Sequence, residues 1–221
     1  MPKLEVCAST IESALNAQNA GADRIELCTE LSVGGLTPSY GMIKLAKDLL
    51  EIPIYVLIRP RAGDFNYSQL EVEQMKEDIL FCTKQQVDGV VIGALTKDRM
   101  IHEPTLLELL STAGYMDVTF HRAFDEVPNH FEAMDTLIEM GLQRILTSGG
   151  LGGAQANVDM LGDLIDEAGD ELIIMPGGGV RHENVSSFIE IGAKEIHSSC
   201  IVNGGRHSNL EQIAQLKELI K

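Results

Sequence analysis

Short apolar segments alternate with helix-length amphipathic segments along the whole chain of 221 residues. The apolar segments are rich in β-branched residues and have the length of strands. Strands that alternate with helices predict βα units and therefore a parallel sheet. The expected strands are Leu4–Ala8, Arg24–Thr29, Ile54–Arg59, Gly89–Gly93, Asp117–Arg122, Arg144–Ser148, Glu171–Met175 and Lys194–Ser199.

The even spacing of these units favours a closed barrel. No linker-like segment interrupts the sequence, and a (β/α)₈ TIM barrel can be built from roughly 200 residues upward. We therefore expect a single TIM-barrel domain over residues 1–221. A doubly wound open sheet is the alternative, but no strong GxGxxG motif follows the first strand.

Three serine–glutamate pairs predict where helices begin. In a capping box the serine and the glutamate three residues later each bind the other's free backbone amide. The pairs with this spacing are Ser9 with Glu12, Ser68 with Glu71, and Ser208 with Glu211.

Composition restricts the class of partner. The net charge of −16 argues against a nucleic-acid partner. No apolar run approaches the ~18 residues of a membrane span, and the chain enters its first strand without a signal-peptide core, so we expect a cytoplasmic protein without a membrane partner. The four cysteines are scattered and form no CxxC motif, so distant segments must assemble any metal site.

Strand alternation predicts which side chains point to the barrel axis. Apolar residues such as Leu4, Val6, Ile25, Leu27, Ile54, Val56, Ile58, Val118, Phe120 and Ile196 are expected to face the helices. The residues left for the interior are polar or thiol-bearing, namely Glu5, Cys7, Glu26, Cys28, Arg59, His121 and His197. Buried ionised groups need partners, so Glu5, Glu26 and Arg59 are either a structural ion network or part of a functional site at the C-terminal ends of the strands.

Several motifs between residues 4 and 198 resemble those of the CutC copper-homeostasis family. They are Arg24–Cys28, Gly34–Ser39, Ile58–Arg61, Gly63–Phe65, Phe120–Asp125, Leu146–Gly150, Met175–Gly179 and Glu195–Ser198. The resemblance implies a TIM barrel, a cytoplasmic location, a homo-oligomer (dimer or tetramer) and Cu(I) binding at paired cysteines. It supplies no established enzymatic activity, and it leaves the role of Cys200 open.

Cys7 and Cys28 are the candidate copper ligands. They occupy equivalent positions on adjacent expected strands, and parallel neighbours lie ~4.8 Å apart. Thiolates are soft ligands that select Cu(I), and Arg59 or Arg61 could lower the thiol pKa values. The alternatives are two inert buried cysteines or a reversible disulfide.

Glycine-rich loops after the last three strands predict an anion site. The loops are Gly149-Gly150, Gly177-Gly178-Gly179 and Asn203-Gly204-Gly205. Glycine lets backbone amides approach a phosphate, and these loops commonly bind phosphate in this fold. Arg59, Arg61 and Arg122 would add positive charge and Ser198 a hydroxyl donor. The alternative is that the glycines only form tight turns.

Acid–base chemistry would fall to His121, Glu26 and Asp125, with Arg59 beside them. Histidine titrates near neutrality, and a carboxylate can orient it. Two functions therefore stay open: a Cu(I)-binding protein, or a lyase, isomerase or hydrolase acting on a small phosphorylated or carboxylated metabolite.

Overall fold

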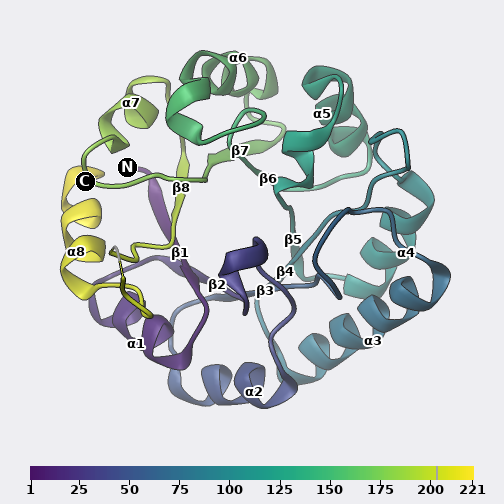
Figure 1. Ribbon diagram of the computed structural model, residues 1–221, viewed down its shortest axis with the longest axis horizontal. Helices are drawn as coiled ribbons and strands as arrows, with labels where there is room; N and C mark the ends of the chain where they lie inside the picture. Colours follow the sequence, from purple (N-terminus) through teal and green to yellow (C-terminus); the bar gives the residue numbers. More distant parts are fainter. Residues whose placement is uncertain (203) are drawn as a thin grey trace.

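The computed structural model describes residues 1–202 and 204–221 and forms a barrel of parallel strands inside a ring of helices (Figure 1). The strands are β1 Lys3–Ala8, β2 Arg24–Leu27, β3 Ile54–Leu57, β4 Gly89–Ile92, β5 Asp117–Phe120, β6 Arg144–Thr147, β7 Ile173–Pro176 and β8 Glu195–Ser198. The helices are α1 Ile11–Asn19, α2 Tyr40–Leu49, α3 Gln69–Gln85, α4 Glu103–Ala113, α5 His130–Glu139, α6 Val158–Ala168, α7 Val185–Glu190 and α8 Leu210–Leu219. Short 3₁₀ turns lie at η1 Leu31–Val33, η2 Arg122–Glu126 and η3 Ala154–Asn157.

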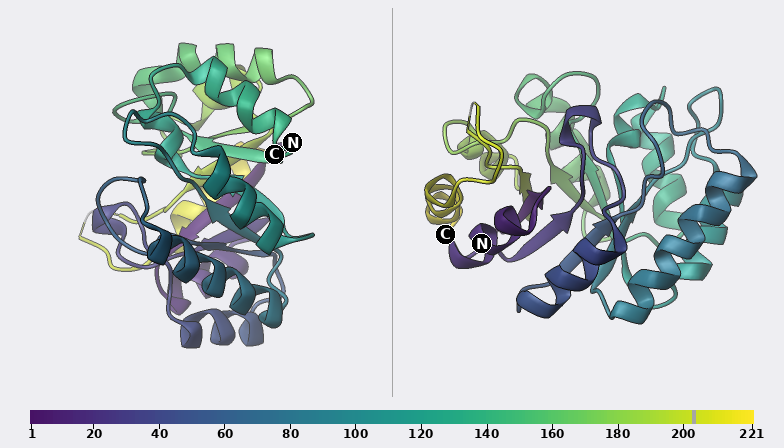
Figure 2. Two further views of the ribbon diagram at one scale, coloured as in Figure 1. Left: turned by 90° about the vertical axis from the view of Figure 1, so that its right-hand side faces the viewer. Right: turned by 60° about the horizontal axis from the view of Figure 1, so that its bottom comes forward.

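The strand order confirms the predicted (β/α)₈ TIM barrel. The eight strands run in the order β7-β6-β5-β4-β3-β2-β1-β8, and β8 returns against β7. A doubly wound sheet would instead reverse its order at an internal switch point. Turning the molecule shows the loops that follow the strands rising at one end of the barrel (Figure 2).

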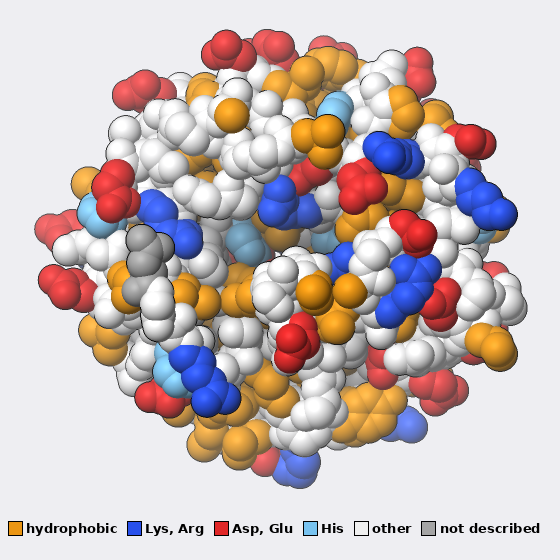
Figure 3. Space-filling view, in the orientation of Figure 1, with side chains coloured by type: hydrophobic (Ala, Val, Ile, Leu, Met, Phe, Trp, Pro, Cys, Tyr) orange, Lys and Arg blue, Asp and Glu red, His pale blue; other side chains and the backbone are white. Residues whose placement is uncertain are grey.

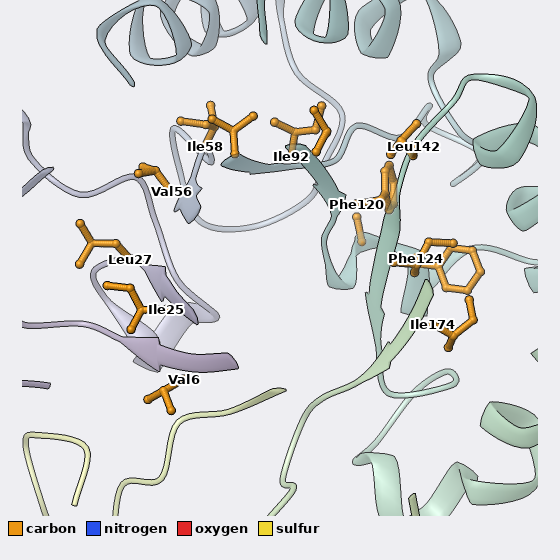
Figure 4. Close-up of a cluster of buried hydrophobic side chains, with 14 of the residues drawn as sticks. Val6, Ile25, Leu27, Val56, Ile58, Ile92, Phe120, Phe124, Leu142 and Ile174 are labelled. Atoms are coloured by element: carbon orange, nitrogen blue, oxygen red, sulfur yellow. The ribbon is translucent and has the colours of Figure 1, made fainter. Parts of the chain in front are cut away.

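Apolar side chains between strands and helices form the core, as the alternation predicts. Val6, Ile25 and Leu27 are fully buried there, and Figure 4 shows them on the outer side of the strands with Val56 and Ile58. A smaller apolar cluster inside the barrel contains Cys7, Cys28, Tyr55, Leu57 and Val91. The other face of the strands therefore carries the residues of the barrel interior.

The register between β1 and β2 differs from the expected one. Cys7 pairs with Glu26 across the ladder, so Cys28 lies two residues further along β2 than the partner of Cys7. The expectation that Cys7 and Cys28 occupy equivalent positions was therefore wrong. Strands of a barrel are staggered against one another, and sequence alternation alone does not give that stagger.

Several strands end earlier than predicted, and this affects the site. Cys28, Arg59, His121 and Ser148 follow the last residues of their strands. The backbone amides of Cys28 and His121 still donate to Ala8 and Ile92 on neighbouring strands, at 3.1 and 2.8 Å. These residues therefore start the loops at the barrel mouth from a fixed backbone.

One of the three predicted capping boxes is present. Ser68 and Glu71 form it at the start of α3. At α1 the side chain of Thr10 caps the helix, and at α8 that of Asn209 does so, where we expected Ser9 and Ser208. Threonine and asparagine satisfy the same free amides, so residue type alone did not separate neighbouring candidates.

In the parts of the chain that the structure describes, no helix has both the length and the hydropathy that crossing a membrane requires.

Candidate functional site

A pocket of about 410 Å³, lined by both apolar and charged side chains, opens at the C-terminal ends of the strands. This volume lies within the ~300–1,000 Å³ of small-molecule sites. The chemically active residues that line it are Cys7, Glu26, Arg59, His121, Arg122, Asp125, Glu126, Arg181, His197, Ser198 and Ser199. Figure 3 shows basic and histidine side chains gathered around the hollow in the middle of this face.

The Cys7 and Cys28 sulfurs lie 3.5 Å apart, which confirms that the two thiols converge despite the shifted register. Both are free and buried. Cys28 lies under the η1 loop, where a Cβ added to Gly35 would come within 3.9 Å of its Sγ. Cys7 lines the pocket, so a ligand reaches the pair from the side of Cys7.

The expected lowering of the thiol pKa by arginine is wrong for Cys7. Its pKa is raised well above the ordinary value, because Cys28 hydrogen-bonds to it and because it is buried. The nearby carboxylate of Glu26 raises it further. Arg59 and Arg61 instead bind loop carbonyls and local acids. Cys7 is therefore a neutral thiol at neutral pH.

His197 joins two carboxylates beside the thiols. Its Nδ1 lies 2.7 Å from Glu5 Oε1, and its Nε2 lies 3.5 Å from Glu26 Oε2. Burial lowers the pKa of His197, but the two carboxylates outweigh it and the pKa is raised. Burial raises the pKa of Glu26. One ligand atom each from Cys7, Glu26 and His197 lie within 4.8 Å of one another, the spacing of a metal site.

This donor set suits a soft monovalent copper ion. An ion at ~2.3 Å from sulfur spans at most about 4.6 Å between two sulfurs, and the observed separation is 3.5 Å. Two sulfurs and an imidazole match the soft and borderline ligands that Cu(I) prefers, whereas Glu26 is the hard member of the group.

A buried ion network lies inside the barrel and joins the pocket through the contact between Glu5 and His197. Arg24 donates to Glu5 and, at 2.5 Å, to Glu195, and Arg144 donates to Glu195 at 2.5 Å. Tyr55 lies under both arginines. The expected network of Glu5 and Glu26 with Arg59 is therefore not formed. The alternation that put Glu26 inward also puts Arg24 inward, and this signal was available in the sequence.

The Arg59 guanidinium binds backbone carbonyls of the loops over the barrel, and it does not pair with a described carboxylate. Its guanidinium donates to the carbonyls of Val33, Gly35 and Gly63 at 2.8–3.0 Å and lies 4.8 Å from the centre of the Phe65 ring. Within the described residues its buried Nε has no acceptor. Arg59 thus fixes the η1 loop and keeps one N–H free at the pocket wall.

His121 is a neutral donor. Its Nδ1 accepts from the amide of Ala123 at 3.1 Å, so the ring proton lies on Nε2. That Nε2 is buried and has no partner among the described residues. Burial, and then the charge of Arg59, lower the pKa of His121 to about 3. An imidazole with so low a pKa is a weak base, so His121 is poorly suited to general-base catalysis near pH 7.

Asp125 is saturated with hydrogen bonds. It accepts from Thr147 Oγ1, from the amide and hydroxyl of Ser148, and from Arg122 Nε, at 2.5–2.8 Å. The carboxylate therefore anchors Arg122 and the loop after β6. Asp125 is a positioning residue, because neither of its oxygens is free for the expected acid–base role.

The glycine loops separate into lining and packing positions. Gly150, Gly178 and Gly179 line the pocket, whereas Gly149 and Gly177 pack against Leu161 and Leu146. Gly178 has a φ of +94°, and a Cβ there would lie 3.1 Å from Arg122 Cζ. In the third predicted loop, Asn203 lies outside the described residues and Gly204 and Gly205 are not among the lining residues.

Arg181 was missed from the sequence. It donates to Ser198 Oγ at 3.1 Å and to Ser199 Oγ at 3.2 Å, and it lines the pocket from the loop after β7. Its place two residues after the glycine run was the available signal. Ser198 also donates to the carbonyl of Val180 at 2.7 Å, so its hydroxyl supports Arg181.

Arg61 lies outside the pocket lining. Its guanidinium binds Glu71 at 2.5 Å and Asp64 at 2.9 Å, and it also donates to the carbonyl of Asn66. Both acidic partners are local, so this arginine closes the loop between β3 and α3. Cys200 is buried and likewise outside the lining, and burial raises its pKa.

Comparison with known proteins gives a consistent family. The CutC family model matches residues 2–202. A human copper homeostasis protein cutC homolog is 44% identical over 197 residues, covering 89% of this chain and 72% of that protein. A family protein CutC from Photorhabdus laumondii is 46% identical over 199 residues, covering 90% of this chain and 80% of that protein.

Solved structures agree on the architecture. A CutC structure from Streptococcus agalactiae has a TM-score of 0.86 and 36% identity, and the match covers 90% of this chain and 99% of that one. A structure described as an aldolase has a TM-score of 0.70 at 15% identity, covering 99% and 93%. At that identity the second likeness shows the barrel fold alone.

Proposed function

The chain belongs to the CutC family, a family named for copper homeostasis, and on this premise we propose that it binds Cu(I) through Cys7 and Cys28. The observation that carries the proposal is the pair of buried sulfurs 3.5 Å apart beside an open pocket. Copper is the cargo in this proposal rather than a resident cofactor.

His197 completes the proposed donor set. Its ring lies with Cys7 and Glu26 inside the 4.8 Å cluster. A thiol must lose its proton to bind a metal, and the pKa of Cys7 is raised. Binding of Cu(I) should therefore release protons and tighten as the pH rises, because the ion has to displace them.

A Cu(I) competition titration under reducing conditions tests the proposal. The double variant of Cys7→Ser and Cys28→Ser should lose stoichiometric binding while its circular dichroism spectrum is unchanged. Cys82→Ser is the matched control, because Cys82 is also a buried free cysteine but lies on α3. Unchanged affinity in the double variant, or an equal loss in the control, would place the ion elsewhere.

A second candidate is an enzyme for a small phosphorylated or carboxylated metabolite. The specific observation that favours it is a pocket in which charged groups from several strands converge, more than two thiols require. Of the four expected residues, Glu26 is the proposed acid–base group. His121 and Arg59 would donate hydrogen bonds to the substrate, and Asp125 would position Arg122. Arg122, Gly150, Gly178 and Gly179 are proposed to contact the anion. Gly149, Gly177 and Ser198 would support the loops, and Arg61 would fix the neighbouring loop.

Thermal melting against a metabolite panel tests this candidate. A ligand at 100 times its dissociation constant stabilises the folded state by ~2.7 kcal/mol, which gives a clear rise in the melting midpoint. A hit is then assayed for turnover. If no member of the panel shifts the midpoint, the enzyme candidate is lost and the Cu(I) proposal is unaffected.

The surroundings of the protein are part of the proposal. The family resemblance supports a cytoplasmic location and a homo-oligomer, either a dimer or a tetramer. The even spacing of the βα units supports one barrel domain over residues 1–221. The net charge of −16 argues against a nucleic-acid partner, and the lack of an apolar run of membrane-spanning length in this sequence argues against a membrane partner. Fractionation of cells and light scattering of the purified protein are the direct measurements.

A further inference from the structure

Two arginines at the pocket have no carboxylate partner. Among the described residues, no acidic oxygen lies within 4.0 Å of the Arg59 or Arg181 guanidinium, although Arg24, Arg61, Arg122 and Arg144 all have one. In a chain with a net charge of −16, acidic partners are abundant. Positive charge kept unpaired beside a pocket attracts anions.

Arg122 and Arg181 line the pocket from different loops, and Gly178 lines it with them. Gly178 lies directly beneath Arg122, where a Cβ would meet Cζ at 3.1 Å, and Arg181 follows three residues later in the same loop. Asp125 fixes Arg122 at 2.8 Å, and Ser198 and Ser199 fix Arg181. Both guanidiniums are therefore held in place before any ligand arrives, which lowers the entropy lost on binding.

A second observation deeper in the pocket points to a ligand. His121 and Arg59 are 5% and 6% exposed, and each has a buried N–H without an acceptor among the described residues. A buried donor left unsatisfied costs about 1–3 kcal/mol. Such donors persist at functional sites because a bound molecule supplies the acceptor.

We propose that the mouth of the pocket is a subsite for a phosphate group, held by Arg122 and Arg181 over Gly178. In the same ligand, a carbonyl or hydroxyl oxygen accepts hydrogen bonds from His121 Nε2 and Arg59 Nε. The ligand class is a small phosphorylated carbonyl or hydroxyl compound. This inference rests on the second proposed function, but it concerns binding and can be tested without turnover.

The subsite is separate from the thiol pair. Cys7 lines the same pocket and Cys28 does not, but neither arginine hydrogen-bonds to a cysteine in the described part of the chain. Arginine forks match phosphate oxygens in geometry and charge. The neutral ring of His121 suits an uncharged carbonyl oxygen, because it donates one hydrogen bond without adding charge.

The experiment measures binding of inorganic phosphate and of dihydroxyacetone phosphate by melting midpoint and by ³¹P NMR, at constant ionic strength with chloride as the balance. Wild type should bind both, and the carbonyl compound more tightly. Arg122→Met and Arg181→Met should each weaken both ligands by about tenfold or more, as expected when a hydrogen bond to a charged group is lost. Arg99→Met removes an exposed arginine outside the pocket and should leave both unchanged.

His121→Ala should remove the preference for dihydroxyacetone phosphate while leaving inorganic phosphate binding in place. If Arg181→Met fails to fold, the more exposed Arg122→Met carries the test alone. No binding of either ligand by wild type, or an equal loss in Arg99→Met, overturns the inference. Phosphate binding without turnover of any substrate supports the subsite and removes the enzyme candidate. Turnover of a carboxylated substrate without phosphate binding supports the enzyme candidate and removes the subsite. The Cys7→Ser and Cys28→Ser variant should keep phosphate binding.

Discussion

Replacing Arg24 with methionine should destabilise the barrel by about 3–5 kcal/mol at pH 7, the usual result of removing one partner of a buried ion pair. Arg24 is 5% exposed, and its guanidinium binds Glu5 and Glu195 inside the barrel. Methionine keeps much of the apolar stem but leaves Glu5 buried beside fewer positive groups. The substitution therefore tests the charge and not the volume.

The pKa of Glu5 gives the same magnitude independently. Burial raises this pKa, but Arg24 and then His197 outweigh it, and the pKa falls from 4.5 to about 2. Each pKa unit corresponds to about 1.4 kcal/mol, so ionised Glu5 contributes about 3–4 kcal/mol. Because the folded-state pKa is the lower one, this contribution is complete above pH 4.5 and is lost as the pH falls towards 2.

The variant should reverse part of this dependence. Without Arg24, burial raises the pKa of Glu5, so the side chain takes up a proton at mildly acidic pH and its unpaired charge disappears. Urea unfolding of wild type and Arg24→Met at pH 7 and pH 5 should show a smaller difference at pH 5. Lys44→Met is the control, since its pair with Asp48 is exposed and contributes ~0–1 kcal/mol. A loss below about 1 kcal/mol at pH 7, or a loss that grows on acidification, would refute the reasoning.

Two further predictions concern His121. Gly93→Ala should lower the melting midpoint by the equivalent of about 1–3 kcal/mol, because its Cβ would lie 2.4 Å from His121 Cε1. Gly162→Ala is the control and should not lower the midpoint, because its Cβ would have its nearest atom at 3.5 Å. Equal midpoints for wild type and Gly93→Ala would show that the ring has room to move. The pKa of about 3 predicts that the His121 Cε1 proton keeps its neutral NMR shift down to about pH 4. Since that pKa is lowered, the stability from neutral His121 is present above pH 6.5 and declines as the pH falls towards 3, and a titration midpoint near 6.5 would contradict it.

The barrel could be predicted because its cause is periodic. Eight apolar segments with outward residues such as Leu4, Val6 and Ile25 have to be covered by helices, and all three are buried in the outer core. The stagger between strands has no such signal in one sequence. Cys7 was therefore matched to Cys28, whereas it pairs with Glu26. The thiols still converge because both side chains point inward from adjacent strands.

The partners of the arginines were the least predictable part of the site. Arg59, Arg61 and Arg122 all follow strands and carry the same charge, so the sequence treats them alike. The structure gives Arg61 two local acids, Arg122 one acid, and Arg59 only carbonyls. These differences arise from loop geometry, which depends on contacts between segments far apart in sequence. Arg181 was missed for the same reason.

The η1 loop connects the two proposed activities through the order in which ligands can reach the site. Arg59 fixes this loop through Val33 and Gly35. A Cβ on Gly35 would meet Leu57 at 2.7 Å and would lie 3.9 Å from Cys28 Sγ, so the loop covers Cys28. The fixed loop therefore closes the direct route to Cys28. Cys7 lies on the open side with His197, and the two can receive an ion first. The Cys28 sulfur lies 3.5 Å from the Cys7 sulfur, so an ion bound by Cys7 needs only a short shift to reach it. An anion at the mouth would stand over that entry path, so phosphate should slow Cu(I) loading without changing the affinity set by the buried sulfurs.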